Sequence, residues 1–139
     1  MTARIVSALI LSFVFASAGT AAPKPLTVGV YAGEGTGAED LVTLKRALGT
    51  DESLTVRVLD SIEVGGLKSD PFDGVDVLVV GGGSGTTLGK GLGEAGGTAV
   101  ATFVREGGGY VGLGAGAYLG ARGYNTGTRV LELVDAALV

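Results

Sequence analysis

The chain has 139 residues, and few of its side chains are suited to catalysis. Cysteine and histidine are both absent, which removes the thiolate nucleophile, the usual general base at neutral pH and the commonest transition-metal ligands. Ser84 remains as a hydroxyl nucleophile, with Glu34 or Lys90 as the only bases we would assign to it. Because no spacing argument brings these residues together, a solvated Glu34 and a turn-forming Ser84 are the simpler interpretations.

Two further patterns point to binding sites only weakly. The glycine-rich run at 81–85 looks like a phosphate loop, but it lacks the Gly-Lys-Ser/Thr ending and Lys90 lies too far along the chain. Asp70, Asp73 and Asp76 recur at every third residue, as calcium ligands could, but Asp76 falls within a predicted strand and the known loop pattern is missing. We therefore predict no nucleotide, metal or other cofactor.

The most informative segment is Gly-Leu-Gly-Ala-Gly at 112–116, which follows a short apolar run. It predicts a sharp bend through which a short strand turns into the start of a helix of small residues. Its central residue is Gly114, which accepts strained backbone angles at little cost. Backbone N–H groups there could bind a carboxylate or oxyanion, or the glycines could only make tight turns. The candidate ligand-binding residues are Gly82, Gly83, Ser84, Gly114 and Ala115.

Alternation of β-prone and amphipathic segments predicts the elements that position this bend. Short apolar runs predict strands at 26–31, 54–59, 75–80 and 110–113. Thr36 and Glu39 form a capping-box pattern that predicts the start of a helix. Its apolar face is expected to carry Leu41, Leu44 and Leu48, with Gly49 as the C-cap.

The remaining segments are less regular. Residues 60–74 predict a loop with at most a short helix, and the glycine-interrupted stretch 81–97 is interpreted as loop. A helix is expected at 98–106, ended by three glycines. Strands separated by helices predict an α/β fold of the flavodoxin-like type, an open, mostly parallel sheet with helices on both faces. Ligands of such sheets bind beyond the carboxyl ends of the strands.

The N-terminus reads as a signal peptide. Arg4 precedes an apolar stretch at 5–16 that is short for a bilayer span, and small residues follow to Ala22. We expect a signal peptide at 1–22, one domain at 23–139, and a secreted or periplasmic protein with no stable membrane span after cleavage; an uncleaved anchor is the alternative. The net charge of −4, with no cluster of Lys or Arg, argues against nucleic-acid binding.

Three segments together resemble a known family. They are VYAGEGT at 30–36, DVLVVGGGSG at 76–85 and FVREGGGYVGLGAGAYL at 103–119. In this order they are similar to the biotin-protein ligase N-terminal-like domain of the class I glutamine amidotransferase-like superfamily. The likeness covers most of residues 26–139.

The resemblance implies a lost catalyst. The family carries a G-x-C-x-G turn followed by Ala-Tyr, and the cysteine position is Gly114 here. Family members tend to have Pro where Gly81 stands, and the superfamily's catalytic His would lie beyond the end of this chain. The resemblance therefore implies a non-catalytic domain with a binding or regulatory role toward an unknown small ligand, and it does not imply biotin chemistry, which belongs to a separate domain.

Two alternatives stay open at this point. The first is an amidase or other hydrolase with Ser84 as a substitute nucleophile. The second concerns the apolar end at 130–139, which predicts either a C-terminally truncated chain or a homo-oligomer that covers this edge.

Overall fold

The computed structural model describes residues 24–67, 70–122 and 131–137, so the predicted signal peptide at 1–22 lies outside the described residues. Its elements in chain order are β1 (Leu26–Tyr31), α1 (Ala38–Leu48), β2 (Leu54–Leu59), the π-helical turn η1 (Glu63–Leu67), β3 (Val77–Val80), α2 (Gly85–Arg105), β4 (Gly109–Gly112), α3 (Ala115–Gly120), β5 (Ala121–Arg122) and β6 (Val134–Ala137).

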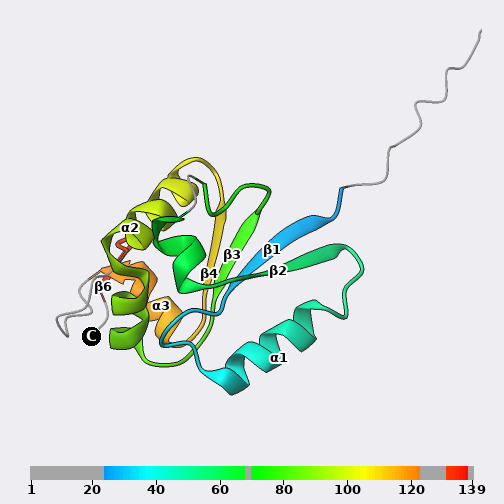
Figure 1. The fold of residues 1–139 in the computed structure, drawn as a ribbon, viewed down its shortest axis with the longest axis horizontal. Helices are drawn as coiled ribbons and strands as arrows, with labels where there is room; N and C mark the ends of the chain where they lie inside the picture. Colours follow the sequence, from blue (N-terminus) through cyan, green and yellow to red (C-terminus); the bar gives the residue numbers. More distant parts are fainter. Residues whose placement is uncertain (1–23, 68–69, 123–130, 138–139) are drawn as a thin grey trace, which may run out of the picture.

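The main sheet has four parallel strands in the order β2-β1-β3-β4. Helix α1 lies on one side of this sheet, while α2, α3 and η1 lie on the other side (Figure 1). This arrangement confirms the predicted open α/β fold of the flavodoxin-like type. The chain reverses its direction of travel across the sheet between β1 and β3, which makes the gap between their carboxyl ends a topological switch point.

The sheet separates two apolar layers because successive side chains of a strand point to opposite faces. On the α1 side, Val28, Val30 and Val79 are buried against the leucines of α1 that the sequence pattern placed on one face. On the other side, a larger cluster includes Tyr31, Leu78, Leu88, Val100 and Leu119. The strands of β1 and β3 are therefore covered on both faces, as their nearly continuous apolar sequences require.

Helix α2 corrects the prediction of a loop at 81–97. The helix begins after Ser84, whose side chain accepts a hydrogen bond from the N–H of Thr87, and it runs to Arg105. Its buried face repeats every fourth residue through Leu88, Leu92, Gly96 and Val100. Gly93 is not helical (φ 61°, ψ −168°), so the element is two helical segments joined at a kink.

The predicted capping box at Thr36 is also wrong. The N-cap of α1 is Gly37, without a side-chain capping bond, and the Thr36 hydroxyl donates instead to the carbonyl of Tyr31 at 3.5 Å. A reciprocal pair of this kind exists elsewhere, because the Glu63 N–H donates to the carboxylate of Asp60 and the Asp60 N–H donates to that of Glu63. This pair begins the short helical turn η1 within the segment expected to be mostly loop.

Strand β3 begins at Val77, two residues later than predicted. Near the end of the chain, β6 pairs in parallel with β5, so the apolar terminus has a strand partner on one side. Within the described ranges, no helix is both long and apolar enough to cross a membrane.

Candidate functional site at the elbow

Gly114 stands between β4 and α3 with backbone angles of φ 53° and ψ −116°. An L-residue with a side chain rarely adopts a positive φ of this kind, and glycine accepts it without a steric penalty. A residue with these backbone angles between a strand and a helix has the geometry of a nucleophile elbow. The predicted bend is therefore present, and its central residue is exposed and has no side chain.

The glycines on either side serve a different purpose from Gly114. A Cβ atom on Gly112 would lie 2.6 Å from the carbonyl oxygen of Gly116, and one on Gly116 would collide with the carbonyl oxygen of Val80. These two positions allow the start of α3 to pack directly on β3 and β4. Among the described residues, and apart from its chain neighbours, the only atom near an added Cβ at Gly114 is the Cα of Gly82, at an ordinary contact distance of 3.5 Å. The space for a side chain at the elbow is thus open.

Hydrogen bonds fix the bend to the neighbouring strand. The N–H of Leu113 donates to Val80 at 2.9 Å, and that of Gly116 donates to Gly81 at 3.1 Å and to Leu113 at 3.0 Å. From the other side, the Tyr110 hydroxyl donates to the carbonyl of Gly116 at 2.7 Å. Burial raises the pKa of Tyr110 well above its usual range, so the phenol stays protonated and keeps donating at neutral pH.

Two loops meet at the switch point next to the elbow. The loop after β1 and the loop after β3 form an antiparallel bridge between Thr36 and Gly83, in which the Ser84 N–H donates to Gly35 at 3.0 Å and the Gly37 N–H donates to Gly82 at 3.0 Å. The Ser84 N–H is therefore already used. Within the described part of the chain, no hydrogen bond is found for the N–H groups of Gly82, Gly83 and Ala115.

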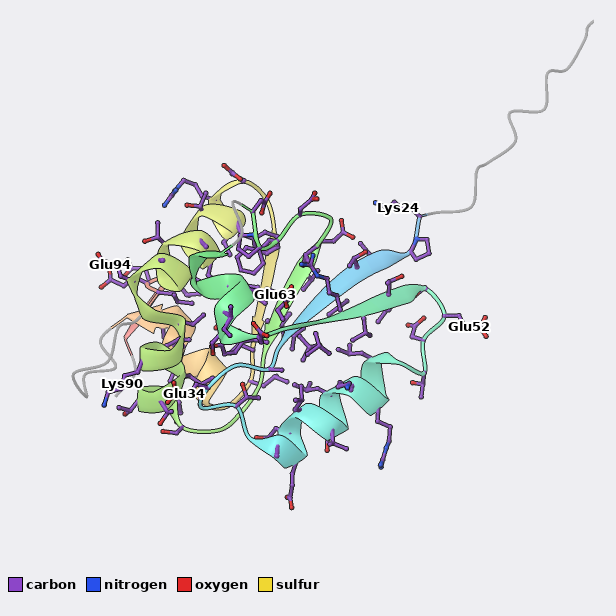
Figure 2. All side chains as sticks on the ribbon, in the orientation of Figure 1. Lys24, Glu34, Glu52, Glu63, Lys90 and Glu94 are labelled. Carbon is purple, nitrogen blue, oxygen red and sulfur yellow. The ribbon has the colours of Figure 1, made fainter. Side chains whose placement is uncertain are left out.

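The three side chains considered for catalysis do not form a catalytic arrangement. Ser84 is the N-cap of α2, and its Oγ also accepts from the hydroxyl of Thr87 at 3.0 Å. Glu34 is exposed, and its main chain packs on Gly91 of α2 while its N–H donates to Ser61 at 2.7 Å. Lys90 extends from α2 into solvent (Figure 2). No described hydrogen bond or ion pair connects Ser84 with Glu34 or Lys90.

One carboxylate next to the Gly82 loop was not indicated by the sequence. Asp40 in the first turn of α1 lies against the backbone of Gly82, so close that a Cβ on that glycine would overlap the Asp40 carboxylate. Helix α1 places it there because Leu44, one turn later, packs under Gly81. In the sequence, Asp40 reads as an ordinary acidic residue at a helix N-terminus, and only the packing of α1 on the sheet shows its position.

A groove of about 860 Å³ lies at the opposite edge of the sheet. Its lining includes residues 70–76 before β3 and residues 106–108 before β4, so it faces the amino ends of the strands. Asp70, Asp73 and Asp76, whose spacing suggested calcium ligands, line this groove. The Asp70 carboxylate accepts a hydrogen bond from the Phe72 N–H, and the Asp76 carboxylate accepts one from the Thr27 N–H. The first bond stabilises a local turn and the second connects the start of β1 with the segment before β3. No cluster of potential metal ligands is found among the described residues.

Comparison with known proteins agrees with the geometry. The family model for the N-terminal domain of biotin-protein ligase matches residues 26–136. The chain belongs to this family. No curated protein sequence matches it. The match spans every described strand of the main sheet and the elbow, so the family resemblance inferred from the three motifs is confirmed.

Proposed function

We propose that this protein is an exported, non-catalytic member of the biotin-protein ligase N-terminal family that binds a small ligand at the elbow with backbone N–H groups. The observation that carries the proposal is the empty apex, since Gly114 keeps the elbow angles and open space but has no side chain. The predicted signal peptide supports export to the periplasm or the medium.

The chemistry of the site favours a ligand with a carbonyl oxygen. The N–H groups of Gly82 and Gly83 belong to the loop after β3, and that of Ala115 lies at the start of α3, all at the carboxyl edge of the sheet. None of the three has a partner among the described residues. N–H donors of this kind suit an oxyanion, a carboxylate or an amide carbonyl. The position at the switch point is where open α/β sheets bind ligands.

Asp40 favours an amide over a carboxylate. Its carboxylate touches the Gly82 backbone, so an anionic ligand on the same loop would face a like charge, whereas the NH₂ group of a primary amide could donate toward it. We therefore propose a neutral primary amide as the ligand class.

A titration of the protein with matched small molecules tests the proposal. Propionamide and propionate have nearly the same shape, and two-dimensional NMR of the backbone amides reports which residues respond. We expect propionamide to shift the resonances of Gly82, Gly83 and Ala115 more than propionate does, and Asp40→Asn to reduce this preference. Equal shifts across the whole protein, or shifts confined to the groove at 70–76, would overturn the proposal.

The competing hypothesis is a hydrolase with Ser84 as the nucleophile. Both hydrogen bonds of the Ser84 hydroxyl serve to start α2, which counts against it. Ester and amide substrates incubated with the protein and with Ser84→Ala separate the two ideas, because turnover that disappears in the variant would defeat the non-catalytic proposal.

A further inference from the structure

An apolar surface lies on the α1 side of the sheet next to the elbow. Val111 of β4 is in register with Val79, whose side chain is buried against the leucines of α1, so both face this side. Leu113 faces it as well, because it follows Val111 by two residues and its N–H continues the pairing to Val80. Helix α1 packs on β1 and β2, and the side chains of Val111 and Leu113 are 44% and 45% exposed. We call this exposed pair the β4 strip.

The β4 strip begins beside the candidate ligand site. The register of β3 and β4, continued by one residue, places Gly81 next to Leu113 at the spacing of neighbouring strands, about 4.8 Å. A Cβ atom on Gly81 would lie 2.9 Å from Cδ1 of Leu44 and 3.9 Å from Cβ of Asp40. Leu113 is therefore one strand away from Leu44 and Asp40, and Gly81 has no side chain to separate them.

The two ends of this surface differ in polarity. At the elbow end are the Asp40 carboxylate and the unpaired N–H groups described above, which can fix the orientation of an amide. Along the strip, residues 107–121 contain no Asp, Glu, Lys or Arg, so a polar substituent on the ligand would lose water there without a charged partner. A few fixed polar groups beside an apolar surface are typical of sites for small amphipathic ligands.

We propose that the ligand is an aliphatic primary amide, with its amide group at the elbow beside Asp40 and its hydrocarbon chain along Leu113 and Val111. This inference rests on the proposed function and names the class of substituent that the same site selects. The strip extends over two residues, roughly 6.6 Å along the strand, so it accommodates a chain of a few carbons. Leu113, which is next to the amide position, becomes the main specificity-determining residue.

A series of amides of increasing chain length tests the inference. Propionamide, butanamide and hexanamide share the same head group and differ only in methylenes, and NMR titration of the backbone amides gives a Kd for each. Because the strip is half exposed, we expect Kd to fall about twofold per added methylene, or roughly tenfold from propionamide to hexanamide. Hexanamide should also shift the resonances of Val111 and Leu113.

The outcomes separate this inference from the proposed function. If all three amides bound with the same Kd and shifted only the Gly82 loop and Ala115, the chain-length inference would be wrong and the proposed function would stand. If another part of the chain covered the strip, Val111 and Leu113 would respond to none of the amides, which also overturns the inference. Binding of no amide at all would remove both.

A substitution in the strip provides the matched comparison. Leu113→Ser should reduce the tenfold preference for hexanamide over propionamide to below about threefold. Val58→Ser makes a similar change at a 40% exposed position of β2 on the same face of the sheet, and it should retain the full preference. Val111→Ser is a second variant should Leu113→Ser fail to fold. An equal preference for hexanamide in the strip variants and in Val58→Ser would contradict the proposal.

Discussion

The three glycines of the elbow meet two different requirements at the scale of single residues. Gly112 and Gly116 allow backbone to approach backbone, since an added Cβ on either would overlap a carbonyl oxygen. Gly114 has room for a side chain but takes a positive φ. In a family member with a side chain at this position, the only energetic cost would therefore be conformational strain.

Gly116→Ala should be among the most damaging single changes in the chain. The new methyl group would displace α3 from β3, and we expect a loss of more than ~3 kcal/mol in the free energy of unfolding, or failure to fold. Gly65→Ala is the matched control, because no described atom beyond its own helical turn lies within 4 Å of its added Cβ. Denaturant unfolding of both variants measures the difference, and equal stabilities would show that α3 does not pack on β3 as described.

The buried Tyr110 makes the free energy of unfolding depend on pH in the alkaline range. Its pKa is raised by burial, so the folded state keeps the proton while the unfolded chain loses it above about pH 10. The stabilising contribution is therefore complete below that pH and declines as the pH rises further. Burial raises the pKa of Tyr31 as well, so this decline has two sources.

Tyr110→Phe should lower the free energy of unfolding by about 1 kcal/mol at neutral pH, since the bond to Gly116 is lost. We also expect the variant to lose less stability than the parent between neutral and strongly alkaline pH. Urea unfolding at several pH values measures both effects. If the stability of parent and variant changed with pH in the same way, the Tyr110 hydroxyl would be exposed to water rather than buried.

The residues of the site were predictable from the sequence only in part. The spacing of small residues at 112–116 indicated the bend, and the proximity of Gly82 followed from the order of the strands. Asp40 could not be identified in this way, because its position beside Gly82 depends on how far α1 extends beneath the sheet. The hydrogen bond that occupies the Ser84 N–H likewise arises from a contact between two loops.

At the scale of elements, α2 shows where local propensity fails. Glycine disfavours helices, which is why 81–97 read as loop. The four-residue repeat of Leu88, Leu92, Gly96 and Val100 was the signal available, and burial of this face overrides the propensity. At Gly91 an added Cβ would lie 2.8 Å from the Cβ of Glu34, so at least one of the glycines is present to admit the loop after β1.

The kink in α2 provides a test at this scale. Gly93 has a φ of 61° with open space around it, so Gly93→Ala should cost about 1 kcal/mol through strain alone. Thermal unfolding, with Gly65→Ala as the control for helix propensity, measures this cost. A Gly93→Ala variant as stable as that control would mean that α2 can run straight through this position.

At the scale of the whole molecule, the parallel order β2-β1-β3-β4 was predictable because strands alternated with helical segments and right-handed crossovers leave few topologies. The strands were found nearly where the apolar runs indicated, since buried parallel strands have almost no polar positions.

The topology brings the elbow, the Gly82–Gly83 loop and Asp40 to one edge of the sheet. The account depends on an elbow that keeps a backbone conformation which would be strained for a residue with a side chain. The most direct test is equilibrium denaturant unfolding of Gly114→Cys compared with Gly65→Cys, the same substitution at a glycine with open space and no positive φ. The account predicts that Gly114→Cys folds and loses about 1–3 kcal/mol relative to that control. A Gly114→Cys variant as stable as the control, or more stable, would contradict the elbow.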